Sequence, residues 1–188
     1  MGQSLGDASA QIHAEWLVAD ARQQIDGLQR NQGRGLFDVG GHNGLAQLVA
    51  ELEGLLSSAS DPEHKARAGE MLEPVYLRHA NWAKVKTALD ARLSSSQDPG
   101  ERRDLLQRLA TLHEEQLEDY ASALETVAKL LHEDLSDEGV WAELERLAKV
   151  AGAEKRLAAI YAAELSALSA DDGSSAKLAR RTGEIYAD

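Results

Sequence analysis

The chain contains no cysteine, only three prolines and few aromatic residues, and each scarcity excludes a class of structure or chemistry. Without cysteine, the chain cannot form disulfide bonds, and it has no thiolate to act as a nucleophile or as a metal ligand. Because proline breaks helices and β-branched or aromatic runs favour strands, their scarcity beside abundant Ala, Leu and Glu favours helix along nearly the whole chain. Its hydrophobic content of 43% is that of a folded protein.

Basic residues are also in the minority, since 20 Lys and Arg stand against 32 Asp and Glu, for a formal net charge of -12. Nucleic-acid and anionic membrane surfaces both require a basic face, and the pairs Arg102-Arg103 and Arg180-Arg181 are isolated. The sequence therefore predicts no nucleic-acid partner. A solvated acidic surface is the expectation, and it leaves a basic protein partner open.

Long apolar runs are missing as well. No segment approaches the roughly 20 apolar residues that a membrane-spanning helix needs, so no membrane insertion is expected. The first ten residues, MGQSLGDASA, lack the charged start and apolar core of a signal peptide. A cytoplasmic location is the default expectation.

The clearest pattern lies in residues 141–165, where two short apolar stripes at helical spacing meet at Gly152. The first stripe continues into the second without any long polar loop between them. Neither stripe can be buried alone, so the two helices are expected to close as a hairpin and to stack on neighbours. The stripe residues are Trp141, Leu144, Leu147 and Ala148, then Leu157, Ile160, Tyr161 and Leu165.

Capping residues and breaks divide the rest of the chain. Three helix starts are predicted at Asp61-Pro62, Asn81-Trp82 and Asp98-Pro99, because Asp and Asn cap helices. In the two Asp-Pro pairs, proline also fits the first turn. Pro74 falls inside a predicted helix. The stretch 31–44 contains five glycines and predicts a loop.

This reading gives two regions. Residues 1–43 are expected to form an N-terminal helix and the Gly-rich loop, and residues 44–188 a series of helical repeats. The repeat region is divided into hairpins at about 44–78, 82–117, 121–151 and 154–188. An internal period supports the division, since Leu105, Arg108 and Leu112 match Leu178, Arg181 and Ile185 at 73 residues. Leu72-Glu73 matches Leu144-Glu145 at 72.

Residues 45–188 resemble the tetratricopeptide repeat family, of the divergent bacterial type. Trp141, Leu144, Gly152 and Tyr161 fall at the matching places of its helical hairpin. The chain departs from the pattern where the family has a small residue, with Glu73 and Glu145, and Leu117 lengthens a turn by one residue. The resemblance implies an all-α, right-handed superhelix, here of about nine helices, whose first helices line a concave groove.

Carrying the family's inward positions onto this sequence gives a groove of mixed charge that becomes more basic toward the C-terminal side. The resemblance implies that such a groove binds a peptide or a partner helix. A solvated face without a ligand is an equal alternative. The groove positions are Arg67, Glu70, Gln107, Thr111, Glu114, Ala142, Arg146, Lys149, Lys177 and Arg180.

No motif for catalysis stands out, so the chain is not expected to be an enzyme or to hold a metal or cofactor. The segment FDVGGH at 37–42 is similar to a switch segment of small GTPases, but the phosphate-binding GxxxxGK[ST] is missing. The six histidines form neither HxxxH nor HExxH, and His113 reads as a packed core residue. An unfamiliar active site at Asp38 and His42 is the remaining enzymatic alternative.

These observations favour a non-catalytic scaffold for protein–protein interaction. Two alternatives stay open. The chain could be a structural segment of a longer repeat protein, or it could self-associate through its last helix, where Leu178, Ile185 and Tyr186 would form an uncovered apolar stripe.

The packing model makes a first prediction. Leu109→Ala or Leu144→Ala should lower the free energy of unfolding by about 2–5 kcal/mol, because each removes buried apolar surface and leaves a cavity. Thermal melts of the two variants measure the loss. The packing model fails if neither variant is destabilised.

Overall fold

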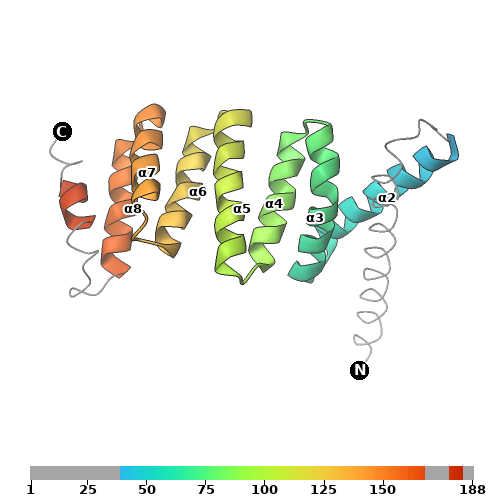
Figure 1. The fold of residues 1–188 in the computed structure, drawn as a ribbon, viewed down its shortest axis with the longest axis horizontal. Helices are drawn as coiled ribbons and strands as arrows, with labels where there is room; N and C mark the ends of the chain where they lie inside the picture. The colour runs from blue at the N-terminus through green and yellow to red at the C-terminus, as the bar shows by residue number, and fades with distance from the viewer. Residues whose placement is uncertain (1–38, 168–177, 184–188) are drawn as a thin grey trace, which may run out of the picture. The chain divides into compact units, whose positions relative to one another are not determined.

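The structure, a computed structural model, describes residues 39–167 and 178–183, and every regular element within these ranges is helical. The helices follow one another with short connections (Figure 1). None of the described helices is both long and apolar enough to cross a membrane. The elements are α2 (Val39–Ser58), α3 (Pro62–Arg78), α4 (Trp82–Ser95), α5 (Pro99–Thr111), η1 (Leu112–Gln116), α6 (Tyr120–Glu133), α7 (Glu138–Ala151), α8 (Glu154–Ala167) and a helical segment at 178–183.

The capping signals of the sequence are confirmed at three helix starts. Asp61 accepts a hydrogen bond from the Glu63 N–H at 2.9 Å, and Asp98 accepts one from the Glu101 N–H at 2.8 Å. Asn81 caps α4 by accepting from the Lys84 N–H at 3.4 Å. Each side chain satisfies a backbone donor that the first turn of a helix leaves unpaired.

The predicted Gly-rich loop is wrong over residues 39–44, because α2 already begins at Val39. Leu48, Leu52 and Leu56 of this helix are buried, and α2 packs against α3. Once such a packed stretch is helical, adding further turns requires no new nucleation. Glycine disfavours those turns by about 1 kcal/mol per residue relative to alanine, but it does not forbid them.

The chain divides into two compact units, at 1–96 and 97–188. In the described part of the first unit, α3 packs along both α2 and α4. Gly69 of α3 lies so close to α4 that a Cβ atom there would stand 2.7 Å from the backbone oxygen of Ala88. Ala68 and Leu72 of the same helix are fully buried, and Pro74 lies inside α3 as expected.

In the second unit, α6 packs against both α5 and α7, and α7 packs against α8. The hairpin predicted at 82–117 spans the boundary between the two units, and its pairing stays a prediction. So do the count of nine helices and the superhelical arrangement.

The two apolar stripes around Gly152 are confirmed as core. Trp141, Leu144 and Tyr161 have no exposed surface, whereas Leu165 is half-buried. Gly152 ends α7 with φ at 61°, in the left-handed region that glycine adopts without a steric penalty.

The extra residue predicted at Leu117 is accommodated by a widened turn. After α5, η1 is a π-helical turn, and the Leu117 N–H donates to the Leu112 carbonyl, five residues back, at 3.1 Å. A π turn absorbs one additional residue without ending the helix. His113 in this turn is buried, as the sequence predicted.

One expectation about the last helix is wrong. Leu178 was expected to contribute to an uncovered apolar stripe, but its side chain is fully buried. Ile185 and Tyr186, the other members of that stripe, lie outside the described residues. Arg181 of the same segment pairs with Glu145 of α7.

The close approach of α3 and α4 gives a paired prediction. Gly69→Ala should lower the free energy of unfolding by up to about 2 kcal/mol, because overpacking against Ala88 costs roughly 1–3 kcal/mol and the gain in helix propensity offsets only about 1 kcal/mol of it. Gly54→Ala in α2 meets no atom within 4 Å and should stabilise by about 0.5–1 kcal/mol. Urea unfolding measures both, and equal effects of the two substitutions would contradict the close contact.

Candidate interaction surface

The predicted groove residues lie on the surface of both units. Arg67 and Glu70 belong to α3 of the first unit and are exposed. In the second unit, Glu114 is half-buried on η1, and Lys177 lies outside the described residues. The exposed positions of that unit are Gln107 and Thr111 on α5, Ala142, Arg146 and Lys149 on α7, and Arg180 at 178–183.

The structure brings two of these positions together. The Arg146 Nη2 atom lies 2.6 Å from the Glu114 Oε2 atom, which joins α7 to η1. Arg146 also contacts Glu143 of its own helix at 2.7 Å. By contrast, Arg67 pairs with Glu63 on α3, four residues away.

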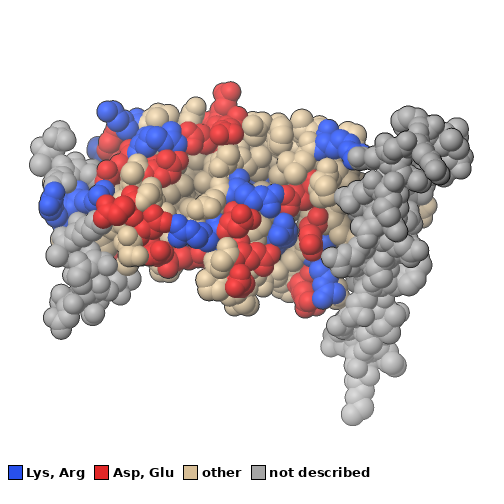
Figure 2. Space-filling model, viewed as in Figure 1, with Lys and Arg blue, Asp and Glu red and all other residues tan. Residues whose placement is uncertain are grey.

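Arg146 therefore does not present a bare positive charge. Its hydrogen bond holds the pKa of the Glu143 carboxyl below its usual value, and both carboxylates raise the pKa of the guanidinium. A partner that binds here meets a hydrogen-bonded cluster in which two carboxylates flank a single guanidinium. Figure 2 shows the same intermixing more widely, with Lys and Arg interspersed among Asp and Glu on the displayed face.

Further ion pairs join different helices of the second unit. Arg102 of α5 reaches Glu133 at the end of α6, while Arg103 reaches Asp137, the capping residue of α7, 34 residues away. Arg156 of α8 contacts Glu125 of α6 at 2.7 Å, 31 residues away. These contacts place α5 beside α7 and α6 beside α8.

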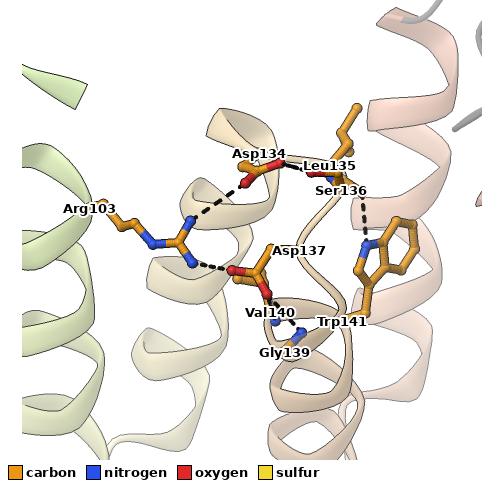
Figure 3. Close-up of polar contacts among 8 residues, drawn as sticks. All are labelled: Arg103, Asp134, Leu135, Ser136, Asp137, Gly139, Val140 and Trp141. Carbon is orange, nitrogen blue, oxygen red and sulfur yellow. Dashed lines mark hydrogen bonds and ion pairs between the residues drawn. The ribbon is translucent and has the colours of Figure 1, made fainter. Parts of the chain in front are cut away.

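Arg103 is the centre of the polar cluster in Figure 3. Its guanidinium pairs with Asp137 and lies 3.7 Å from the Asp134 carboxylate, so it spans both ends of the turn between α6 and α7. Asp137 also accepts hydrogen bonds from the backbone N–H groups of Gly139 and Val140, at 2.8 and 3.3 Å. Arg103, followed by these backbone donors, holds the pKa of the Asp137 carboxyl below its usual value.

The remaining contacts of Figure 3 fix the turn itself. Asp134 accepts from the Ser136 hydroxyl at 2.6 Å and from the Ser136 N–H at 2.9 Å, and these bonds lower the pKa of its carboxyl. The Trp141 Nε1–H donates to the Leu135 carbonyl at 3.0 Å. The largest buried side chain of α7 is thereby tied to the turn that precedes it.

The two glutamates that depart from the family pattern each contact a neighbouring helix. Glu145 pairs with Arg181 of the segment 178–183 and accepts from the Tyr161 hydroxyl at 3.4 Å. Glu73, whose side chain is only 7% exposed, receives a 2.8 Å hydrogen bond from Arg92 of α4. A small residue at these positions would provide no such acceptor.

Aromatic contacts complete the site of Glu145. The Arg181 guanidinium lies 4.9 Å from the centre of the Trp141 ring, within the range of a cation–π interaction. The Trp141 and Tyr161 rings are 5.1 Å apart. Burial, and then the nearby Glu145 charge, raise the pKa of the Tyr161 hydroxyl, so it remains a hydrogen-bond donor.

Within the described ranges, no three His, Asp or Glu side chains gather in a way that could hold a metal ion. The alternative site at Asp38 and His42 cannot be placed, since both side chains lie outside what the structure describes. The absence of enzymatic, metal and cofactor functions stays a prediction.

Sequence reasoning missed Arg103, Asp137, Arg156 and Arg181, which join the helices of the second unit. A signal for them exists, because their partners stand 31 to 36 residues away and always carry the opposite charge. That spacing is close to the length of one helical hairpin in the predicted repeat.

No protein-family model, curated protein or solved structure matches this chain. The likeness to tetratricopeptide repeats therefore depends on the residues quoted from the sequence.

The Arg103 cluster gives a prediction that separates capping from ion pairing. Asp137→Ala should lower the free energy of unfolding by about 0.5–2 kcal/mol, because α7 loses its N-cap. Asp137→Asn keeps an equally good cap and loses only the charge, which for a half-exposed pair is worth about 0–1 kcal/mol. Chemical denaturation of both variants compares the two losses. If Asp137→Asn is as damaging as Asp137→Ala, the charge of Asp137 contributes more than its cap.

Proposed function

We propose that this chain is a non-catalytic scaffold that binds another protein through the exposed residues of α3, α5 and α7. The supporting observation is the alignment of α5 and η1 with α7 in the second unit. Two ion pairs, Arg103 to Asp137 and Glu114 to Arg146, hold these helices side by side. Their solvent-facing residues then form one continuous polar row.

The proposal extends this row to the whole repeat region as a right-handed superhelix of the tetratricopeptide type. In that arrangement α3, α5 and α7 line a concave groove, and a peptide or a helix of the partner lies along it. An extended surface of this kind binds through many small contacts distributed over several helices. It needs no deep cavity and no catalytic group.

The chemistry of the row favours a partner that supplies both hydrogen-bond donors and acceptors. Gln107 and Thr111 are neutral, and the charge of Arg146 is shared with two carboxylates. Lys149 is exposed near the end of α7, beside Val150, whose side chain is 53% exposed. A carboxylate and an apolar group on the partner would complement these two neighbours.

Charge reversal on α7 tests the proposal. The full chain and the variant Arg146→Glu/Lys149→Glu are immobilised and exposed to a lysate of the source cells, and the captured proteins are quantified. Proteins that bind the row should be recovered from the wild type and lost from the variant, because two contact residues change sign.

A matched control lies on α8. Lys155→Glu/Arg156→Glu also reverses two exposed basic residues, one of which is an arginine paired with a glutamate of another helix. The control should retain the partners, and circular dichroism melts verify that both variants are folded. Equal recovery by the wild type and both variants would remove the basis for a binding row on α7.

A further inference from the structure

The turns that follow α3 and α7 are closed by the same backbone hydrogen bond. After α3, the Asn81 N–H donates to the carbonyl of the buried Tyr76 at 2.9 Å. After α7, the Ala153 N–H donates to the carbonyl of the buried Ala148 at 2.8 Å. In both turns the donor therefore stands five positions after its acceptor.

The turn that follows η1 is closed in the same way, but it contains one residue more. Here the Asp119 N–H donates to the carbonyl of the buried His113, six positions back, at 2.8 Å. Glu118, immediately before the donor, has φ at 50°, and Ala80 precedes its own donor with φ at 49°. The two turns are thus equivalent at both ends, and the extra residue lies between His113 and Glu118, where the helix is π-helical.

The residue after the acceptor is oriented differently in the longer turn. In the two shorter turns this residue is Leu77 or Lys149, and both are exposed. In the longer turn it is Glu114, which is half-buried and has its Oε2 atom 2.6 Å from the Arg146 Nη2 atom of α7. A π turn contains more residues than an α turn, so it rotates each successive side chain by a smaller angle about the helix axis. The wider turn thereby directs Glu114 toward α7.

The contact between Glu114 and Arg146 supports one end of the row formed by α5, η1 and α7. The other end is supported by Arg103, in the first turns of α5, which pairs with Asp137 at the start of α7. Glu114 lies beyond the last residue of α5. The two contacts hold the helices side by side on both sides of the exposed residues that the partner is proposed to bind.

We infer that the π turn of η1 is a positioning element of this row, with the role of turning Glu114 toward Arg146. The inference rests on the proposed function, because such positioning matters only if the row is used for binding. Two other turns of the chain are closed with one residue fewer, so closing a hairpin does not require the extra residue. A π turn is rare, and it occurs frequently at functional sites.

Deletion of Gln116 in the full chain tests the inference. Gln116 is exposed, and its removal restores the five-position spacing between the acceptor His113 and the donor Asp119. The variant should fold with a melting temperature within about 4 °C of the wild type, because it loses only a half-exposed ion pair. Gln116→Ala keeps the length of the turn and provides the matched control.

A double-mutant cycle measures the contact itself. Glu114→Gln and Arg146→Gln should shift the urea midpoint non-additively in the wild type and in Gln116→Ala, and additively after deletion of Gln116. Equal coupling in all three backgrounds would overturn the inference, because Glu114 would then reach Arg146 without a π turn. A deletion that unfolds the second unit would also overturn it, because the extra residue would then serve folding.

Capture from the lysate separates this inference from the proposed function. Deletion of Gln116 and Glu114→Gln should each reduce recovery of the bound proteins several-fold, and the two changes together should reduce it no further. If Arg146→Glu/Lys149→Glu loses the partners and the deletion retains them, the proposed function stands and the inference falls. If the wild type captures no partner, the proposed function falls, and the urea cycle still decides whether the turn positions Glu114.

Discussion

The structure depends on one constraint: the apolar stripe of each helix can be buried only by the helices on either side of it. Trp141 and Tyr161 show it most clearly, since they come from α7 and α8 and neither has any exposed surface. Their rings lie 5.1 Å apart, so each covers part of the other. Removing either aromatic residue would leave the other partly hydrated, which couples the stability of α7 to that of α8.

Charged residues define how the helices are placed once this burial holds them together. A half-exposed ion pair contributes only about 0–1 kcal/mol, so Arg156 with Glu125 adds little to the free energy of folding. The pair matters more for the register between α6 and α8, because a shift of one helix along the other would separate the two charged groups. Glu73 is different, because its side chain is nearly buried and receives a hydrogen bond from Arg92 of α4.

The amino-acid sequence correctly predicted the features that depend only on residues close together in the chain. Helix starts at Asp61 and Asp98 were correct because a cap requires only its own first turn. The apolar stripe of α7 was correct because burial follows helical periodicity. The loop predicted over 39–44 failed, since the packing of Leu52 and its neighbours extends α2 against the preference of glycine. Partners such as Arg103 and Asp137 were missed, because the helical period within one helix does not pair residues of different helices; only their separation of about one hairpin pointed to the contact.

The use of charge inside the second unit also limits what its surface can recognise. The chain carries a net charge of -12, yet several of its arginines, Arg102, Arg103, Arg146 and Arg156 among them, are occupied with carboxylates of other helices. A ligand attracted by a single sign of charge would have to break such pairs, and each broken pair exposes one unmatched charge. The proposed recognition through α5 and α7 would therefore depend on side-chain hydrogen bonds and shape more than on net attraction. Arg181 of the segment 178–183 is occupied in the same way, because its guanidinium pairs with Glu145 and lies over the Trp141 ring.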